Sequence, residues 1–100
     1  MDLHINPFRC GTEKEAARKV VEEAAEAFSA WETLSHSAVL DGIGYNPHIE
    51  RRTAAFANEI ADCITACCNL ADRYGIDMQD ALGRVERKNR ERGRYENGCG

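Results

Sequence analysis

Two long segments with helical periodicity each carry a pair of acidic residues spaced three apart, and this repeated arrangement constrains the fold more than any other feature. The first pair is Glu23 and Glu26, preceded by Glu22, and the second is Glu59 and Asp62. Residues three apart share a face of an α-helix. If the two helices pack side by side, four carboxylates converge and repel one another unless a cation lies among them. Oxygen ligands of this kind suit Mg²⁺ or Mn²⁺.

The first helix is bounded by a capping box. After an irregular arm of residues 1–11, Thr12 and Glu15 have the spacing at which each side chain bonds the other residue's backbone amide. The apolar residues that follow share one face, which predicts a helix to about Leu34. Residues 35–45 contain two glycines and predict a turn-rich connection.

The second helix is expected to begin at an Asn-Pro pair. Asn46 suits the N-cap and Pro47 suits the first helical position, where the missing amide hydrogen is not needed. The helical pattern continues to about Tyr74, and Gly75 is a typical residue at the end of a helix.

A third helix is predicted over residues 77–92, and Gly93 is expected to end it. No useful length of the chain shows the two-residue alternation of a β-strand. The fold class is therefore all-α: we expect an antiparallel helical bundle in which residues 1–100 form one domain.

Each long helix carries an apolar stripe beside its acidic pair. Glu23 and Glu59 border these stripes and have small neighbours, which allow a partner helix to approach closely and leave a carboxylate poorly solvated. Neither residue has a Lys or Arg four positions later to offset its charge. The alternative is that the acids only solvate a helix face. The stripes comprise Val20, Val21, Ala24, Phe28 and Trp31, and Phe56, Ala57, Ile60, Ile64 and Cys67; the small neighbours are Ala27, Ala30, Cys63 and Ala66.

The composition excludes several classes of protein. A formal net charge of −4 argues against a nucleic-acid binder. There is no apolar run long enough for a membrane span, and the first residues lack the pattern of a signal peptide. Five cysteines without a C-x-x-C pair indicate a reduced, cytoplasmic protein without a disulfide framework or a zinc site.

Three segments in this order resemble a known family. The segments are Lys-Val-Val-Glu-Glu-Ala-Ala-Glu at 19–26, Asn-Glu-Ile-Ala-Asp at 58–62 and Lys-Asn-Arg-Glu-Arg-Gly-Arg-Tyr at 88–95. Together they resemble the MazG-like, all-α nucleoside triphosphate pyrophosphohydrolases. The resemblance implies cleavage between the α and β phosphates of a nucleotide, giving the monophosphate and pyrophosphate. It also implies a Mg²⁺ ion held by four carboxylates and a homodimer or homotetramer; the implied ligands are Glu23, Glu26, Glu59 and Asp62.

Hydrolysis of a polyphosphate requires its charge to be neutralised and a water molecule to be oriented. Glu22 is a candidate acceptor for the water's proton, although it does not share a face with its neighbour Glu23 and can equally face solvent. Lys88 and Arg92 lie one turn apart and are candidates to bind the phosphates. The alternative is that they favour the helix dipole.

Three other residues are candidates to bind the nucleoside. Trp31 can stack on a base, although packing in the core explains it equally well. Asn89 can pair with a base or sugar edge, and Tyr95 can cover the pocket.

The sequence is also compatible with other functions. Within the same superfamily, the alternatives are a phosphoribosyl-ATP or deoxynucleotide-specific pyrophosphatase. The alternative from another class is a non-catalytic helical oligomerisation module. A di-iron carboxylate protein is disfavoured because the chain has no Glu-x-x-His. Both long helices carry more apolar surface than a short third helix can cover, which predicts a dimer or a dimer of dimers.

Overall fold

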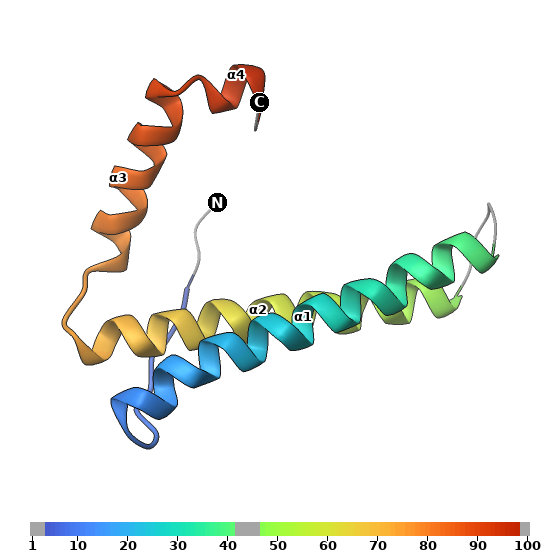
Figure 1. Ribbon diagram of the computed structural model, residues 1–100, viewed down its shortest axis with the longest axis horizontal. Coiled ribbons are helices and arrows are strands. Elements are labelled where there is room, and N and C mark those ends of the chain that lie inside the picture. Colours follow the sequence, from blue (N-terminus) through green and yellow to red (C-terminus); the bar gives the residue numbers. More distant parts are fainter. Residues whose placement is uncertain (1–3, 42–46, 99–100) are drawn as a thin grey trace.

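Two long helices, α1 (Glu13–Asp41) and α2 (Pro47–Arg73), lie side by side as a hairpin (Figure 1). A computed structural model describes the backbone of residues 4–41 and 47–98. Glu13 Oε1 lies 3.6 Å from Arg73 Nη1, so the start of α1 meets the end of α2 and the pair is antiparallel. Helix α3 (Met78–Glu91) and the single turn α4 (Arg94–Asn97) lead away from the hairpin. Every regular element within the described ranges is a helix, which confirms the all-α class.

Local sequence signals placed most helix ends correctly. The amide of Thr12 donates to Glu15 Oε2 and the amide of Glu15 donates to Thr12 Oγ1, both at 3.2 Å, as the capping box predicts. Asp77 caps α3 by accepting the amide three residues on, at 3.1 Å. Gly75 and Gly93 have φ of 65° and 68°, a left-handed conformation that glycine adopts without a Cβ clash.

The prediction that the first helix ends near Leu34 is wrong. Helix α1 continues to Asp41, through residues expected to form the turn-rich connection. The buried Ser37 donates its hydroxyl to the Thr33 carbonyl at 2.8 Å, a back-bond within the helix that satisfies a polar group inside the helical conformation. The expected cap at Asn46 lies outside the described residues. The turn α4 was not predicted; it follows directly on Gly93.

The two long helices contact each other through their small residues. Among the described side chains, the buried hydrophobic ones are three alanines, Ala16, Ala66 and Ala71. Of the small neighbours of the acids predicted to allow a close approach, Ala66 is buried, and Ala27, Ala30 and Cys63 are half-buried. The larger apolar residues point elsewhere: Val21 is 69% exposed and Phe28 is 60% exposed. Most of the two apolar stripes is therefore not packed within the chain: Val20 and Phe56 are half-buried, and the other stripe residues are exposed.

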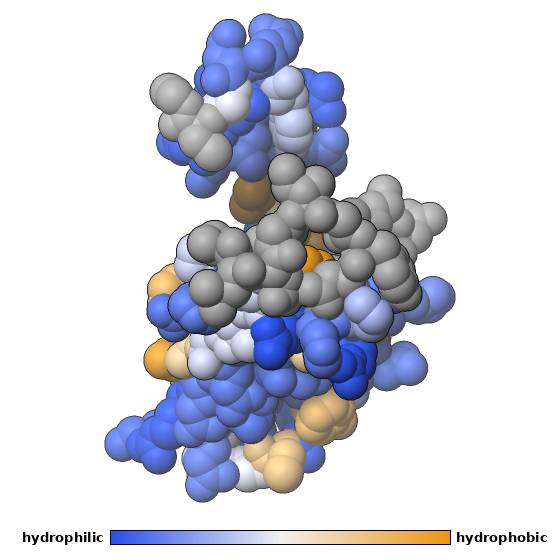
Figure 2. All heavy atoms as spheres, turned by 90° about the vertical axis from the view of Figure 1, so that its right-hand side faces the viewer, coloured by the Kyte–Doolittle hydropathy of each residue, from blue (hydrophilic) through white to orange (hydrophobic). Residues whose placement is uncertain are grey.

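The surface reflects this arrangement. Apolar side chains, coloured tan to orange, appear among hydrophilic ones on the hairpin, while the α3–α4 end at the top of the view is mostly hydrophilic (Figure 2). Within the described ranges, no helix combines the length and hydropathy that a membrane crossing requires.

Candidate metal centre

Three of the predicted acids meet where the two long helices pack together. Glu23 and Glu26 on α1 and Glu59 on α2 each bring one carboxylate oxygen to within 4.8 Å of the others. Glu23 is only 7% exposed and Glu59 is partly buried. For both residues, the Oε2 atom is buried and has no hydrogen-bond partner in the described part of the chain. Buried carboxylate oxygens without partners are costly, so this acidic triad is suited to accept a cation.

Lys19 provides one positive charge at the edge of the acidic triad. Its Nζ lies 2.9 Å from Glu23 Oε1 and 3.8 Å from a Glu22 oxygen, and the hydrogen bond to Glu23 raises the pKa of the lysine. The pKa of Glu26 is also raised, chiefly by the charge of Glu23 and then by a hydrogen bond to it. One ammonium group next to three carboxylates leaves a net negative charge, which raises the proton affinity of the outermost acid.

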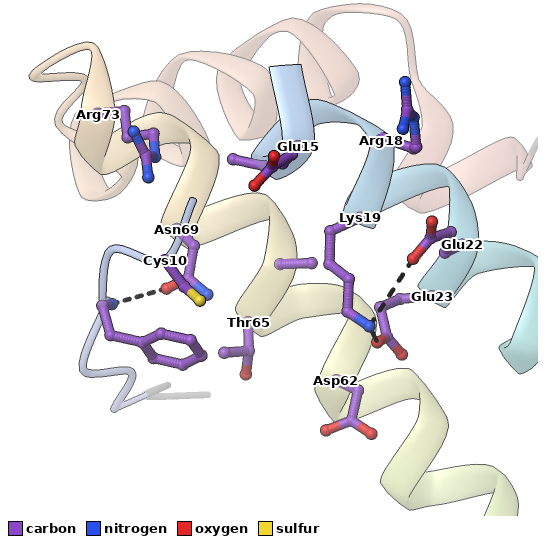
Figure 3. Close-up of a pocket in the computed structure, with 13 residues that line it drawn as sticks. Cys10, Glu15, Arg18, Lys19, Glu22, Glu23, Asp62, Thr65, Asn69 and Arg73 are labelled. Carbon is purple, nitrogen blue, oxygen red and sulfur yellow. Dashed lines mark hydrogen bonds and ion pairs between the residues drawn. The ribbon is translucent and has the colours of Figure 1, made fainter. Parts of the chain in front are cut away.

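Two other predicted acids lie near the acidic triad without belonging to it. Asp62 is exposed and contributes no oxygen to the triad, but it lines a cavity that Glu23 also lines (Figure 3). Glu22 is exposed too, and its carboxylate lies on the Lys19 side of the helix. Among the described residues, three of the four predicted ligand carboxylates therefore converge.

The predicted residues on α3 and α4 are not brought to the acidic triad within one chain. Asn89 Oδ1 accepts a bond from Arg94 Nη1 at 3.4 Å, and the Tyr95 ring lies 5.2 Å from the Arg90 guanidinium. Lys88 and Arg92 lie on the same segment, which extends away from the hairpin in Figure 1. Trp31 does not line the cavity; it is exposed and pairs with Phe28, with ring centroids 5.7 Å apart.

Lys19 was not predicted as a partner of the acids. No basic residue stands four positions after either inner carboxylate, but Lys19 stands four positions before Glu23. Residues four apart in either direction are neighbours on a helix surface. The i, i+4 spacing of Lys19 and Glu23 is therefore the sequence signal that predicts this ion pair.

A second missed feature is the cavity beside the acidic triad. It measures about 480 Å³, lies against both long helices, and has residues of the N-terminal arm in its wall. The arm is irregular and reaches residues more than sixty positions away on α2, such as Asn69. No local pattern in the sequence indicates a contact of that range.

The donor set of the acidic triad consists of carboxylate oxygens alone. Hard divalent cations such as Mg²⁺ and Mn²⁺ prefer such ligands, whereas zinc sites usually include nitrogen or sulfur. The buried oxygens of Glu23 and Glu59 are the atoms that fit this role best. No protein-family model, curated protein or solved structure matches the chain.

Proposed function

We propose that this protein is a magnesium-dependent nucleotide pyrophosphohydrolase that cleaves between the α and β phosphates. The observation that carries the proposal is the convergence of Glu23, Glu26 and Glu59, with two buried oxygens that have no partner among the described residues. A cation that satisfies these oxygens also attracts a polyphosphate, because the phosphate oxygens complete its coordination. The sequence resemblance to MazG-like enzymes supports the same reaction.

The helix interface explains how the acids can serve a metal. Glu23 and Glu59 extend from two different helices at a contact made by alanines, so their backbones are held close while their carboxylates repel. Glu23, Glu26 and Glu59 would hold the Mg²⁺ ion, which would supply charge neutralisation for a phosphate and a bound water of lowered pKa. Glu26 completes the triad from the more solvated side, and Asp62 is a further ligand on the cavity side.

Two further charged residues, Glu22 and Lys19, are candidates to act on the attacking water and on a phosphate group. Glu22 is exposed next to Glu23, and we propose it as the acceptor of a proton from the attacking water. Lys19 lies between the acidic triad and the cavity, where its ammonium group can pair with a phosphate oxygen when a cation replaces it at Glu23. These two residues thus provide a proton acceptor and a phosphate contact within one turn of α1.

We also propose that the protein functions as a homodimer or a dimer of dimers. In the part of the chain that the structure describes, the buried hydrophobic residues are three alanines, and many large apolar side chains are exposed. Contiguous exposed apolar surface typically marks an interaction site. A second copy with the same face can cover it. The exposed residues on the hairpin are Val21, Phe28, Trp31, Ile60 and Ile64.

Assembly also offers a role for the segment that leads away from the hairpin. Lys88, Asn89, Arg92 and Tyr95 are far along α3 and α4 from their own chain's acids, and a neighbouring copy can receive them. We propose that Lys88 and Arg92 bind the phosphates of a substrate held by another subunit. Leu82 and Val85 on α3 are exposed and are available to pack in such an assembly.

A metal titration with product analysis tests the reaction. We expect Mg²⁺ or Mn²⁺ to raise the melting temperature of the wild-type protein, and ³¹P NMR to show pyrophosphate and monophosphate as products. Glu32→Gln removes an exposed acid from the same helix and is the matched control; it should leave both results unchanged. Orthophosphate with a nucleoside diphosphate would contradict the cleavage position.

Two alternative functions can be tested with the same purified protein. A panel of ribonucleotides, deoxynucleotides and phosphoribosyl-ATP separates a general enzyme from a specific pyrophosphatase. A non-catalytic oligomerisation module would assemble through the exposed apolar face but show neither metal stabilisation nor nucleotide turnover.

A further inference from the structure

The cavity beside the acidic triad is formed by segments far apart in the sequence. It lies against α1 and α2, with Phe8 and Cys10 of the N-terminal arm in its wall and Glu23 shared with the triad. Figure 3 shows Asn69 and Thr65 on α2 at one side, and Lys19, Glu23 and Asp62 at the other. Its volume of about 480 Å³ falls in the range of pockets that bind small organic molecules.

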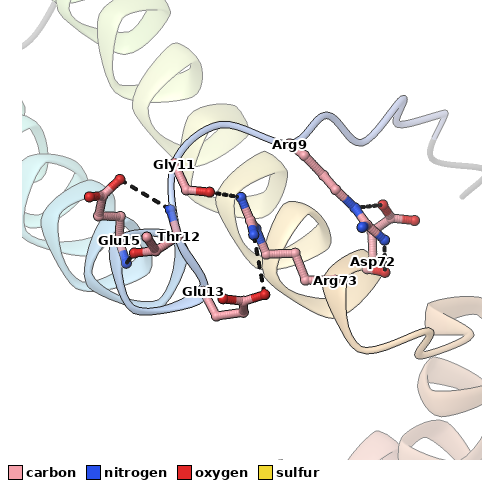
Figure 4. Close-up of polar contacts among 7 residues, drawn as sticks. All are labelled: Arg9, Gly11, Thr12, Glu13, Glu15, Asp72 and Arg73. Carbon is pink, nitrogen blue, oxygen red and sulfur yellow. Dashed lines mark hydrogen bonds and ion pairs between the residues drawn. The ribbon is translucent and has the colours of Figure 1, made fainter.

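The arm is fastened to α2 by several polar contacts. The Phe8 amide donates to Asn69 Oδ1 at 2.8 Å, and Arg9 Nε lies 3.5 Å from Asp72 Oδ2 (Figure 4). The largely buried guanidinium of Arg73 donates to the Gly11 carbonyl and pairs with the carboxylate that begins α1. These contacts hold the arm against the helices, so its side chains form a defined wall of the cavity.

The polar groups in the cavity have complementary hydrogen-bonding capacities. Asn69 Oδ1 accepts the Phe8 amide, and the two N–H donors of this side chain remain available to a ligand. Thr65 donates its hydroxyl hydrogen to the Ala61 carbonyl at 2.9 Å, which leaves the hydroxyl oxygen as an acceptor. Asn69 and Thr65 are one helical turn apart, so a donor and an acceptor stand on the same wall.

An aromatic ring together with a donor and an acceptor is what a nucleobase requires, since it offers a π-face and a polar edge. Because Glu23 of the acidic triad also lines the cavity, the triad indicates how a nucleotide would be oriented there. A nucleotide with its base near Phe8 and Asn69 would lead its phosphates past Lys19 towards Glu23, Glu26 and Glu59.

We propose that this arm-walled cavity binds the nucleoside part of the nucleotide substrate, with Phe8 stacking on the base and Asn69 and Thr65 contacting its edge. The inference rests on the proposed function and adds specificity-determining residues to it. It also moves the stacking role from Trp31, which lies with Phe28 outside the cavity lining, to Phe8.

The test compares Phe8→Ala with Phe8→Tyr and uses Tyr74→Ala as the matched control. Phe8 is 59% exposed and Tyr74, outside the cavity, is 64% exposed, so neither truncation removes a core residue. Calorimetry measures the affinities of the full-length variants for Mg²⁺, for a nucleoside triphosphate and for inorganic tripolyphosphate. We expect Phe8→Ala to lose about 5- to 150-fold in nucleoside triphosphate affinity, the usual effect of deleting a stacked aromatic. Its affinities for Mg²⁺ and tripolyphosphate should stay unchanged, and Phe8→Tyr and Tyr74→Ala should match the wild type.

A second variant tests the cavity without altering the arm. Thr65→Val keeps the shape of a side chain on rigid α2 and removes the acceptor, so we expect a roughly 2- to 10-fold loss of nucleotide affinity with tripolyphosphate binding intact. Unchanged nucleotide affinity in both Phe8→Ala and Thr65→Val would overturn this inference alone, provided the wild type binds Mg²⁺ and nucleotide. A wild-type protein that binds neither would overturn the proposed function, and this inference with it.

Discussion

Replacing Glu59 by Gln should stabilise the metal-free protein and abolish its response to Mg²⁺. One oxygen each of Glu59 and Glu23 lie within 4.8 Å of each other, and at that separation two unit charges repel by about 3.5 kcal/mol at an effective dielectric constant of 20. Each residue also has a buried Oε2 without a partner in the described chain. An amide at position 59 removes the repulsion and can donate to the Glu23 carboxylate.

The net gain is smaller than the repulsion because water and the Lys19 ammonium already screen it. Relief of a buried unsatisfied group is typically worth about 1–3 kcal/mol, and we take the lower half of that range. For a domain of this size, 1 kcal/mol shifts the melting temperature by about 4–8 °C. Glu59→Gln should therefore melt at least about 4 °C above the wild type in EDTA.

Differential scanning calorimetry with and without Mg²⁺ is the assay. The wild type should gain about 2.7 kcal/mol at a Mg²⁺ concentration 100 times its dissociation constant, and Glu59→Gln should gain almost nothing. Glu32→Gln, outside the acidic triad, should behave as the wild type does. If Glu59→Gln melts below the wild type without metal, or keeps the full Mg²⁺ shift, the acidic triad is not a strained cation site.

Three other predictions follow from the same arrangement. The charge of Glu23 raises the pKa of Glu26, so its contribution to the stability of the metal-free protein is favourable below the unfolded-state pKa and is lost as pH rises through the folded-state pKa. Glu26→Gln should flatten this pH dependence in denaturant melts recorded in EDTA; an unchanged profile would contradict the charge coupling. Lys88→Ala should weaken nucleotide binding about tenfold or more with little change in melting temperature, since an exposed lysine contributes little to stability; equal affinity by calorimetry would leave Lys88 as a dipole partner only. Phe28→Asp places a charge on the exposed apolar face and should shift light-scattering mass from an oligomer to a monomer, whereas wild-type protein that is monomeric at micromolar concentration would refute assembly through this face.

The local signals in the sequence determined the all-α class and most helix limits. The Thr12–Glu15 capping box, the Asp77 cap and the glycines at 75 and 93 act within a few residues of themselves, so their geometry does not depend on distant contacts. The spacing of the acids was also decisive, because i, i+3 on a helix places Glu23 beside Glu26 whatever the helix packs against. Ser37 shows the limit of such signals: its hydroxyl bonds back into α1, and the helix runs on to Asp41.

The tertiary structure decided which face of each helix is used. Alanines and Glu23 are buried while most of the apolar stripes remains exposed, a choice that hydrophobic periodicity does not make when both faces are compatible with a helix. The inclusion of Glu59 and not Asp62 in the acidic triad depends on how the two helices are rotated against each other. The cavity depends on bonds such as Phe8 to Asn69, between residues 61 positions apart. A local pattern carries no information at that distance, because the chain must fold before the two residues meet.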